Sequence, residues 1–290
     1  MASVVSNEHS PSDTTAQTTK GRDGRTLMFA EWGAPGGRPV FSLHGTPGCR
    51  LSAPRRVQLG FEEIVRSVGV RLITYDRPGY GGSDRHPGRR VVDCVADVLA
   101  IADAAGIDRF AIEGGSSGAQ HALAVAALAP ERVTRAACVA PMAPYTVLGH
   151  EAWSKDQADG VREYVVACLR GVDRMQAVFG EEDAQMRQEA SAADPRSAEV
   201  FEQTREGLWG WVDDEVSAFQ PWGFDSPAAS VPVAIWHDPR DSVLPGQHAE
   251  WLAAHIPGAT RRSSDALGHG SSGDPKPAWV EVYSWLVDAG

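Results

Sequence analysis

The heptapeptide EGGSSGA, residues 113–119, lies between a short apolar run and a stretch of small residues. The run Arg109–Glu113 predicts a buried strand, and Ser117–Ala129 predicts a helix. The pattern Gly-x-Ser-x-Gly at such a junction is typical of a sharp turn, because glycine tolerates close approach of the chain to itself. The pattern therefore predicts that Ser116 exposes its hydroxyl at the carboxyl edge of a sheet.

Strand and helix patterns alternate on both sides of this turn. Further strands are predicted at Thr26–Trp32, Pro39–Leu43, Val70–Tyr75, Arg132–Ala140, Val231–Trp236 and Ala259–Ser264. Further helices are predicted at Pro54–Arg66, Val91–Ala105, Gly246–His255 and Pro277–Val287. This order predicts the α/β class, with a mostly parallel central sheet and helices on both faces.

Composition divides the chain into a tail, a core and an insertion. Residues 1–20 are rich in polar side chains and are expected to form a flexible N-terminal tail. Residues 142–228 are charged and helix-compatible, contain several tryptophans and show no strand pattern, so they predict an inserted helical lid. The α/β core is then expected to comprise residues 21–141 and 229–290.

Charge and hydropathy exclude several classes of partner. Among 290 residues, 42% are hydrophobic and the net charge is -11, which suits a globular core and opposes binding to a phosphate backbone. No apolar run approaches the roughly 18 to 20 residues that span a bilayer, and the N-terminus lacks the pattern of a secretory signal. Four widely spaced cysteines without a CxxC pair predict reduced thiols. We expect a cytoplasmic protein that binds neither nucleic acid nor membrane.

A serine nucleophile requires a base, and histidine is the side chain that titrates nearest neutrality. Of nine histidines, His269 is the best candidate because it follows the last predicted strand in a Gly-His-Gly-Ser loop. Asp238 and Asp241 follow the preceding strand and lie between serine and histidine in the chain, as an acid should. Asp241 is the preferred acid, while Asp238, beside a proline, suits a turn.

Two backbone amides could stabilise a developing oxyanion. The amide of Ser117 begins a helix, where unpaired N–H groups and the helix dipole favour negative charge. The loop HGTPG, which follows the strand at Pro39–Leu43, would present the amide of Thr46. His44 is expected to hold this loop by hydrogen bonding, and Asp76 to form a turn rather than to carry protons.

Five motifs occur in the order seen in proteins of the α/β-hydrolase fold, which this chain resembles. They are HGTPG at 44–48, DRPGYGGSD at 76–84, GGSSGA at 114–119, DPRDSVLP at 238–245 and GHG at 268–270. The resemblance implies Ser116 as nucleophile, Asp241 as acid, His269 as base, and the Thr46 and Ser117 amides as an oxyanion hole. It further implies cleavage of an ester or related acyl bond of a small molecule through an acyl-serine intermediate, without metal or cofactor.

The motifs specify the fold and the triad but not the substrate. Proline iminopeptidase-like amidases usually have Trp after the nucleophile, where this chain has Ser117. Carbon–carbon bond hydrolases and cofactor-free perhydrolases of this fold share the triad, whereas epoxide hydrolases and haloalkane dehalogenases use Asp in place of Ser116. Asp238 departs from the pattern, since relatives often have Gly there. A ligand-binding receptor on the hydrolase fold is the alternative from another class; its sign would be a missing triad residue, and none is missing.

Overall fold

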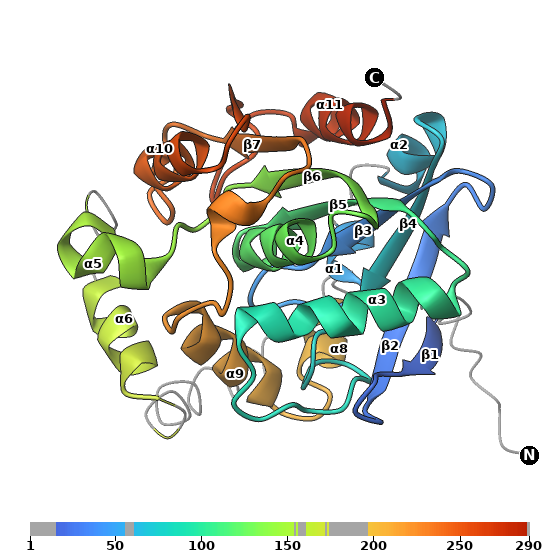
Figure 1. The fold of residues 1–290 in the computed structure, drawn as a ribbon, viewed down its shortest axis with the longest axis horizontal. Coiled ribbons are helices and arrows are strands. Elements are labelled where there is room, and N and C mark those ends of the chain that lie inside the picture. Colours follow the sequence, from blue (N-terminus) through green and yellow to red (C-terminus); the bar gives the residue numbers. More distant parts are fainter. Residues whose placement is uncertain are drawn as a thin grey trace, which may run out of the picture.

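The computed structural model describes residues 16–55, 61–153, 155, 161–171, 173 and 197–288. Its centre is an eight-stranded sheet with the order β1-β2-β4-β3-β5-β6-β7-β8 (Figure 1). The strands are β1 (Ala16–Lys20), β2 (Thr26–Gly33), β3 (Arg38–Leu43), β4 (Val70–Tyr75), β5 (Phe110–Gly115), β6 (Val133–Val139), β7 (Val233–His237) and β8 (Thr260–Ser263). The predicted α/β class is confirmed.

The sheet is antiparallel at one edge and parallel elsewhere. Strand β2 pairs antiparallel with both β1 and β4, and every neighbouring pair from β4 to β8 is parallel. The carboxyl ends of β3, β5, β7 and β8 therefore lie at one edge of the sheet, which is where ligands bind in open α/β sheets. The four motifs that follow these strands are brought to that edge.

Helices cover both faces of the sheet, because the central strands are apolar on both sides. Figure 1 shows α3 (Cys94–Ala104) and α4 (Ser117–Leu128) on one side, with α2 (Phe61–Ser67) and α11 (Pro275–Val287) on the other. Each side has its own buried apolar cluster. The remaining core helices are α1 (Ser52–Arg55), α10 (Gly246–His255) and the short 3-10 turns η3 (Val91–Asp93) and η4 (Ser226–Ala228).

Between β6 and the turn η4, every regular element in the described part of the chain is helical. These helices are α5 (Tyr145–Trp153), α6 (Val161–Leu169), α8 (Ser197–Gln203) and α9 (Trp209–Ala218). A third apolar cluster joins α5, α6 and α9, through residues such as Trp153, Cys168 and Val212. The regular elements described within the expected insertion at 142–228 are thus all helical, and residues 174–196 of it lie outside the described residues.

The expectation of a flexible tail over residues 1–20 is wrong for its last five residues. Ala16–Lys20 form β1 at the edge of the sheet, with Ala16 opposite Ala30 and Lys20 opposite Thr26. The strand is polar because it exposes most of its side chains, and its backbone hydrogen bonds to β2 hold it in place. Residues 1–15 lie outside the described residues.

Two further expectations concern the cysteines and the membrane. All four cysteines, Cys49, Cys94, Cys138 and Cys168, are buried free thiols, as predicted. No helix in the described ranges is long and apolar enough to span a membrane.

Candidate active site

Ser116 lies at the turn between β5 and α4, and the local sequence explains the shape of that turn. Its backbone has φ 54° and ψ -126°, a left-handed conformation that a side chain rarely adopts and that costs about 1–3 kcal/mol. A Cβ on Gly118 would overlap the carbonyl oxygen of Leu43, and a Cβ on Gly114 would overlap that of Gly118. Both glycines are therefore required by close backbone contacts, and the strained turn holds the serine hydroxyl clear of the sheet.

The structure brings Ser116, His269 and Asp241 into one line of hydrogen bonds. His269 Nε2 lies 3.0 Å from Ser116 Oγ, and His269 Nδ1 lies 2.9 Å from Asp241 Oδ2. The Asp241 side chain is 1% exposed and that of His269 is 29% exposed. The hydroxyl is thus within reach of the imidazole, whose other nitrogen is oriented by a buried carboxylate.

Four N–H groups point at the Asp241 carboxylate. Oδ1 accepts hydrogen bonds from the amides of Val243 and Leu244, at 2.9 and 3.0 Å, while Oδ2 accepts the His269 amide at 2.8 Å and the ring Nδ1–H. Burial alone would raise the pKa of Asp241, but hydrogen bonds from the His269 ring, the His269 amide and the Leu244 amide outweigh it and lower the pKa. Asp241 is therefore ionised and fixed in orientation.

Asp238 lies on the same loop but faces away from the imidazole. Its Oδ1 accepts the Arg240 amide at 2.9 Å, which is the turn contact expected from the sequence. Its Oδ2 accepts the Ser271 hydroxyl at 2.8 Å and so ties this loop to the one that carries His269. Of the two aspartates, only Asp241 contacts His269 in the described part of the chain.

Thr46 and Ser117 lie next to each other beside the serine. Their hydroxyl oxygens are 2.5 Å apart, and Gly45 packs so closely that a Cβ there would lie 3.4 Å from that of Ser116. Neither backbone amide donates to a protein acceptor in the described ranges, and the Ser117 amide lies in the first turn of α4. Within the described ranges, no protein group thus competes for either amide.

The residues expected to be structural around this loop are buried. His44 donates from Nδ1 to the Gly45 carbonyl at 2.7 Å and accepts the Arg77 amide on Nε2 at 3.2 Å, so it holds the loop. Burial and the Arg77 guanidinium hold the pKa of His44 well below its usual range. Asp76 accepts the amides of Arg50 and Gly82, as a turn-forming carboxylate should.

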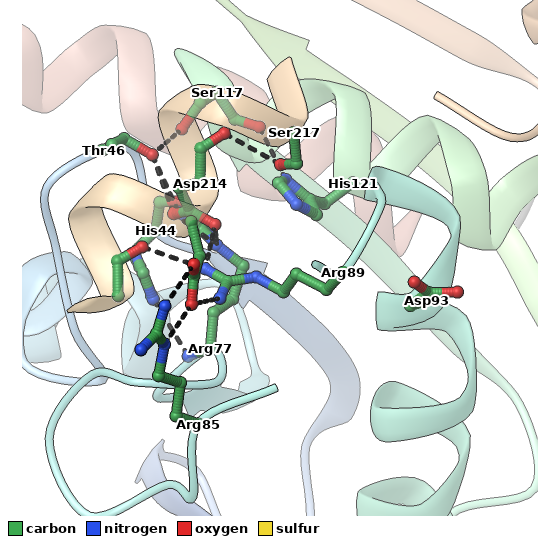
Figure 2. A network of polar contacts seen from close by, with 12 residues as sticks. His44, Thr46, Arg77, Arg85, Arg89, Asp93, Ser117, His121, Asp214 and Ser217 are labelled. Carbon is green, nitrogen blue, oxygen red and sulfur yellow. Dashed lines mark hydrogen bonds and ion pairs between the residues drawn. The ribbon is translucent and has the colours of Figure 1, made fainter. Parts of the chain in front are cut away.

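A buried ionic network beneath the Thr46 loop was not predicted from the sequence (Figure 2). Asp214 of α9 contacts Arg77, Arg89 and the Thr46 hydroxyl. The sequence offered one signal, a run of three acidic residues at 213–215 between two valines. Buried charges require partners, so such a run predicts ion pairs but not which ones.

The mostly parallel sheet, the strained serine turn and the loops at its carboxyl edge together define an α/β hydrolase architecture. The model of the α/β hydrolase fold family matches residues 38–275, so the chain belongs to this family and is an enzyme. A solved esterase from Exiguobacterium antarcticum has the same fold, with a TM-score of 0.69 at 18% identity, covering 94% of this chain and 99% of that one.

Curated relatives carry different activities in their names. A non-heme chloroperoxidase of Streptomyces lividans is 29% identical over 274 residues, which is 86% of this chain and 91% of the relative. A proline iminopeptidase of Xanthomonas citri is 35% identical over 108 residues, which is 36% of this chain. The match spans only 33% of that iminopeptidase, about a third of its length.

Proposed function

We propose that the chain is a serine hydrolase that cleaves an ester or related acyl bond of a small molecule through an acyl-serine intermediate. The observation that carries this proposal is the line Asp241–His269–Ser116, with 2.9 and 3.0 Å between the bonded atoms. A neutral serine hydroxyl is a poor nucleophile, and this arrangement supplies the base that activates it.

In the proposed mechanism, His269 Nε2 takes the proton of Ser116 Oγ as the oxygen attacks the acyl carbon. The carbonyl oxygen becomes an anion, which the amides of Thr46 and Ser117 stabilise. When the tetrahedral intermediate collapses, the imidazolium gives its proton to the leaving alkoxide, and the acyl group stays on Ser116. Water, activated by His269, then releases the acid by the same steps in reverse.

Asp241 supports each of these proton transfers. It holds the proton of His269 on Nδ1, so that Nε2 has a free lone pair toward the serine. It also stabilises the imidazolium that forms, because its lowered pKa keeps it negatively charged.

A cofactor-free perhydrolase is the second candidate, favoured by the near-complete alignment with the Streptomyces lividans chloroperoxidase. In that reaction hydrogen peroxide takes the place of water, attacks the acyl-serine carbonyl and leaves as a peracid, while the proton returns to Ser116. An amidase of the iminopeptidase type would instead release an amine from the first step.

One panel of assays on the wild-type chain distinguishes these reactions. p-Nitrophenyl esters of several acyl lengths test esterase activity, an aminoacyl anilide tests amidase activity, and peracid formation from an ester with hydrogen peroxide tests perhydrolysis. We expect the highest turnover on esters. Turnover of the anilide alone would refute the ester assignment.

The role of Ser116 is tested with a fluorophosphonate probe and the variant Ser116→Ala. We expect a loss of about 10⁴-fold or more in kcat, and loss of labelling, because the covalent route is removed. Ser67→Ala is the matched control, since within the described residues the Ser67 hydroxyl bonds only the Ile64 carbonyl of its own helix. Wild-type turnover by folded Ser116→Ala would refute the mechanism.

The buried free thiols support a reducing compartment, because disulfides form mainly in oxidising ones. We therefore propose that the reaction takes place in the cytoplasm.

A further inference from the structure

A chain of buried polar groups connects the inserted helix α9 to the two amides proposed as the oxyanion hole. Asp214 of α9 is 1% exposed, and Arg77, which follows β4, is fully buried. Figure 2 shows Asp214 between the arginines on one side and Thr46 on the other. These groups lie apart from the Asp241–His269–Ser116 line and are not explained by it.

The Asp214 carboxylate is held by two guanidinium groups. Arg77 Nη2 donates to Oδ2 at 2.5 Å, and Arg89 Nη2 donates to Oδ1 at 2.6 Å. Burial alone would raise the pKa of Asp214, but the charges of Arg77 and Arg89 hold it well below its usual range. The group is therefore a permanent anion that can only accept hydrogen bonds.

This fixed charge sets the direction of the neighbouring hydroxyl bonds. The Thr46 hydroxyl donates its single proton to Asp214 Oδ2 at 2.9 Å, so it must accept the bond from Ser117 Oγ at 2.5 Å. The order is Ser117 to Thr46 to Asp214. Each of the two residues whose amides are proposed to form the oxyanion hole is thus tied by its side chain to one carboxylate.

Arg77 makes the same connection through the backbone. Its guanidinium donates to the carbonyl oxygens of His44 and Gly45, the latter at 2.9 Å, while it pairs with Asp214. The peptide groups that lead into Thr46 are therefore clamped by the partner of Asp214.

We propose that Asp214 is a positioning residue for the oxyanion hole, and that the inserted helix α9 thereby sets the catalytic rate without touching the substrate. The inference rests on the proposed serine hydrolase function. Amides that stabilise an oxyanion act through a fixed position, and removing one such donor costs about 10²- to 10³-fold in kcat. Loosening both donors without removing them should cost less, about 10- to 100-fold.

Asp213 provides a matched control on the same helix. Its carboxylate is buried and pairs with Arg85 at 2.7 Å and with Arg89 at 3.5 Å, so it also fastens α9 to the core. It makes no contact with Thr46 or Ser117 in the described ranges. If kcat depended only on the attachment of α9, both aspartate variants would lower it. If kcat depends on the position of the Thr46 loop, only Asp214→Asn lowers it.

The experiment compares Asp214→Asn, Thr46→Val and the double variant with Asp213→Asn. For each, kcat and KM on one p-nitrophenyl ester, the inhibition constant of a trifluoromethyl ketone and the urea midpoint are measured. The ketone forms a tetrahedral adduct with the serine, so its affinity reports the oxyanion hole.

We expect Asp214→Asn and Thr46→Val to lower kcat by about 10- to 100-fold and to raise the inhibition constant of the ketone by a similar factor. KM should change by less than about 3-fold. The double variant should be little worse than the more severe single variant, because both break one chain of bonds. Asp213→Asn should keep kcat within about 3-fold even where its urea midpoint falls.

Several results would overturn this role for Asp214. One is a folded Thr46→Val enzyme with unchanged kcat and ketone affinity, and this variant decides the matter if Asp214→Asn does not fold. Another is an equal loss of kcat in Asp213→Asn. If the wild-type chain neither turns over an ester nor reacts with a fluorophosphonate, the proposed function itself has failed. Wild-type turnover with unaffected variants refutes only the role of Asp214.

Discussion

Replacing Asp241 by asparagine tests the triad at the atom on which its geometry depends. The substitution keeps the size of the side chain but exchanges one carboxylate oxygen for an NH₂ group. Four N–H groups point at the two Asp241 oxygens, two from the amides of Val243 and Leu244 and two from His269. In either orientation, the asparagine NH₂ must therefore face two N–H groups.

The two orientations differ in how many donors remain without an acceptor. With the NH₂ toward Val243 and Leu244, both backbone hydrogen bonds to Asp241 Oδ1 are lost, at about 1–3 kcal/mol each. With the NH₂ toward His269, only the hydrogen bond of the His269 amide is lost. The ring keeps its bond because it can move its proton to Nε2 and accept the asparagine NH₂ on Nδ1. The second orientation is favoured because it breaks one backbone hydrogen bond instead of two. It leaves the ring proton of His269 on Nε2, facing Ser116.

A ring protonated on Nε2 cannot take the serine proton, so we expect Asp241→Asn to lower kcat by about 10³- to 10⁴-fold. The unsatisfied amide should also lower the free energy of unfolding by about 1–3 kcal/mol. kcat is measured on a p-nitrophenyl ester, and the free energy of unfolding by urea titration.

Asp238→Asn is the matched control. Its remaining oxygen can accept the Arg240 amide, and its NH₂ can donate to the Ser271 hydroxyl, which rotates to accept. We expect less than about a 10-fold change in kcat. A severe loss in Asp238→Asn together with near-normal turnover by Asp241→Asn would reverse the assignment of the acid and refute this reasoning.

Three further predictions concern stability and metals. Gly118→Ala should lower the free energy of unfolding by about 3 kcal/mol or more in a urea titration, because its Cβ would overlap backbone at Leu43, whereas Gly36→Ala, with open space around it, should have little effect. Burial lowers the pKa of His121 to about 3 and of His248 to about 4, so on acidification from pH 7 to pH 5 only the unfolded chain gains these protons. Burial also holds the pKa of His44 well below its usual range, which acts in the same direction, whereas Asp76 and Glu215, whose pKa values burial raises to about 6 and about 7, gain protons in the folded chain and oppose it. The free energy of unfolding should then fall by about 2 kcal/mol, and an unchanged value would contradict this. EDTA should leave ester turnover unchanged, and loss of turnover that zinc restores would contradict the proposed mechanism.

Local features made most of the fold predictable. The predicted helix Gly246–His255 has the observed bounds, and β4 matches the predicted strand at Val70–Tyr75. Both have a clear apolar pattern and are bounded by turn residues, so their structure follows from their own sequence. The serine turn was predicted for the same reason, since its glycines lie within two residues of Ser116.

Features that depend on distant partners were missed. Strand β1 has no apolar face, and its order comes from pairing with β2, which its own residues do not encode. Asp214 bonds Thr46, a residue 168 positions away in the chain. Asp213 and Asp214 are adjacent aspartates on one helix, and only the packing of α9 decides which one faces Thr46.

The ionic attachment of α9 argues for a geometric role rather than a stabilising one. Desolvating Arg77, Arg89 and Asp214 costs several kcal/mol per ion, and well-packed apolar side chains often stabilise such a position equally or better. An apolar contact would not hold the Thr46 hydroxyl or the carbonyls of the preceding loop in one orientation, whereas this network bonds each of them. The two halves of the site would then be positioned independently, the acid and base by loops after β7 and β8, and the oxyanion amides by the inserted helix. A change in the insertion could therefore alter the stabilisation of the oxyanion while leaving the Ser116–His269 contact intact.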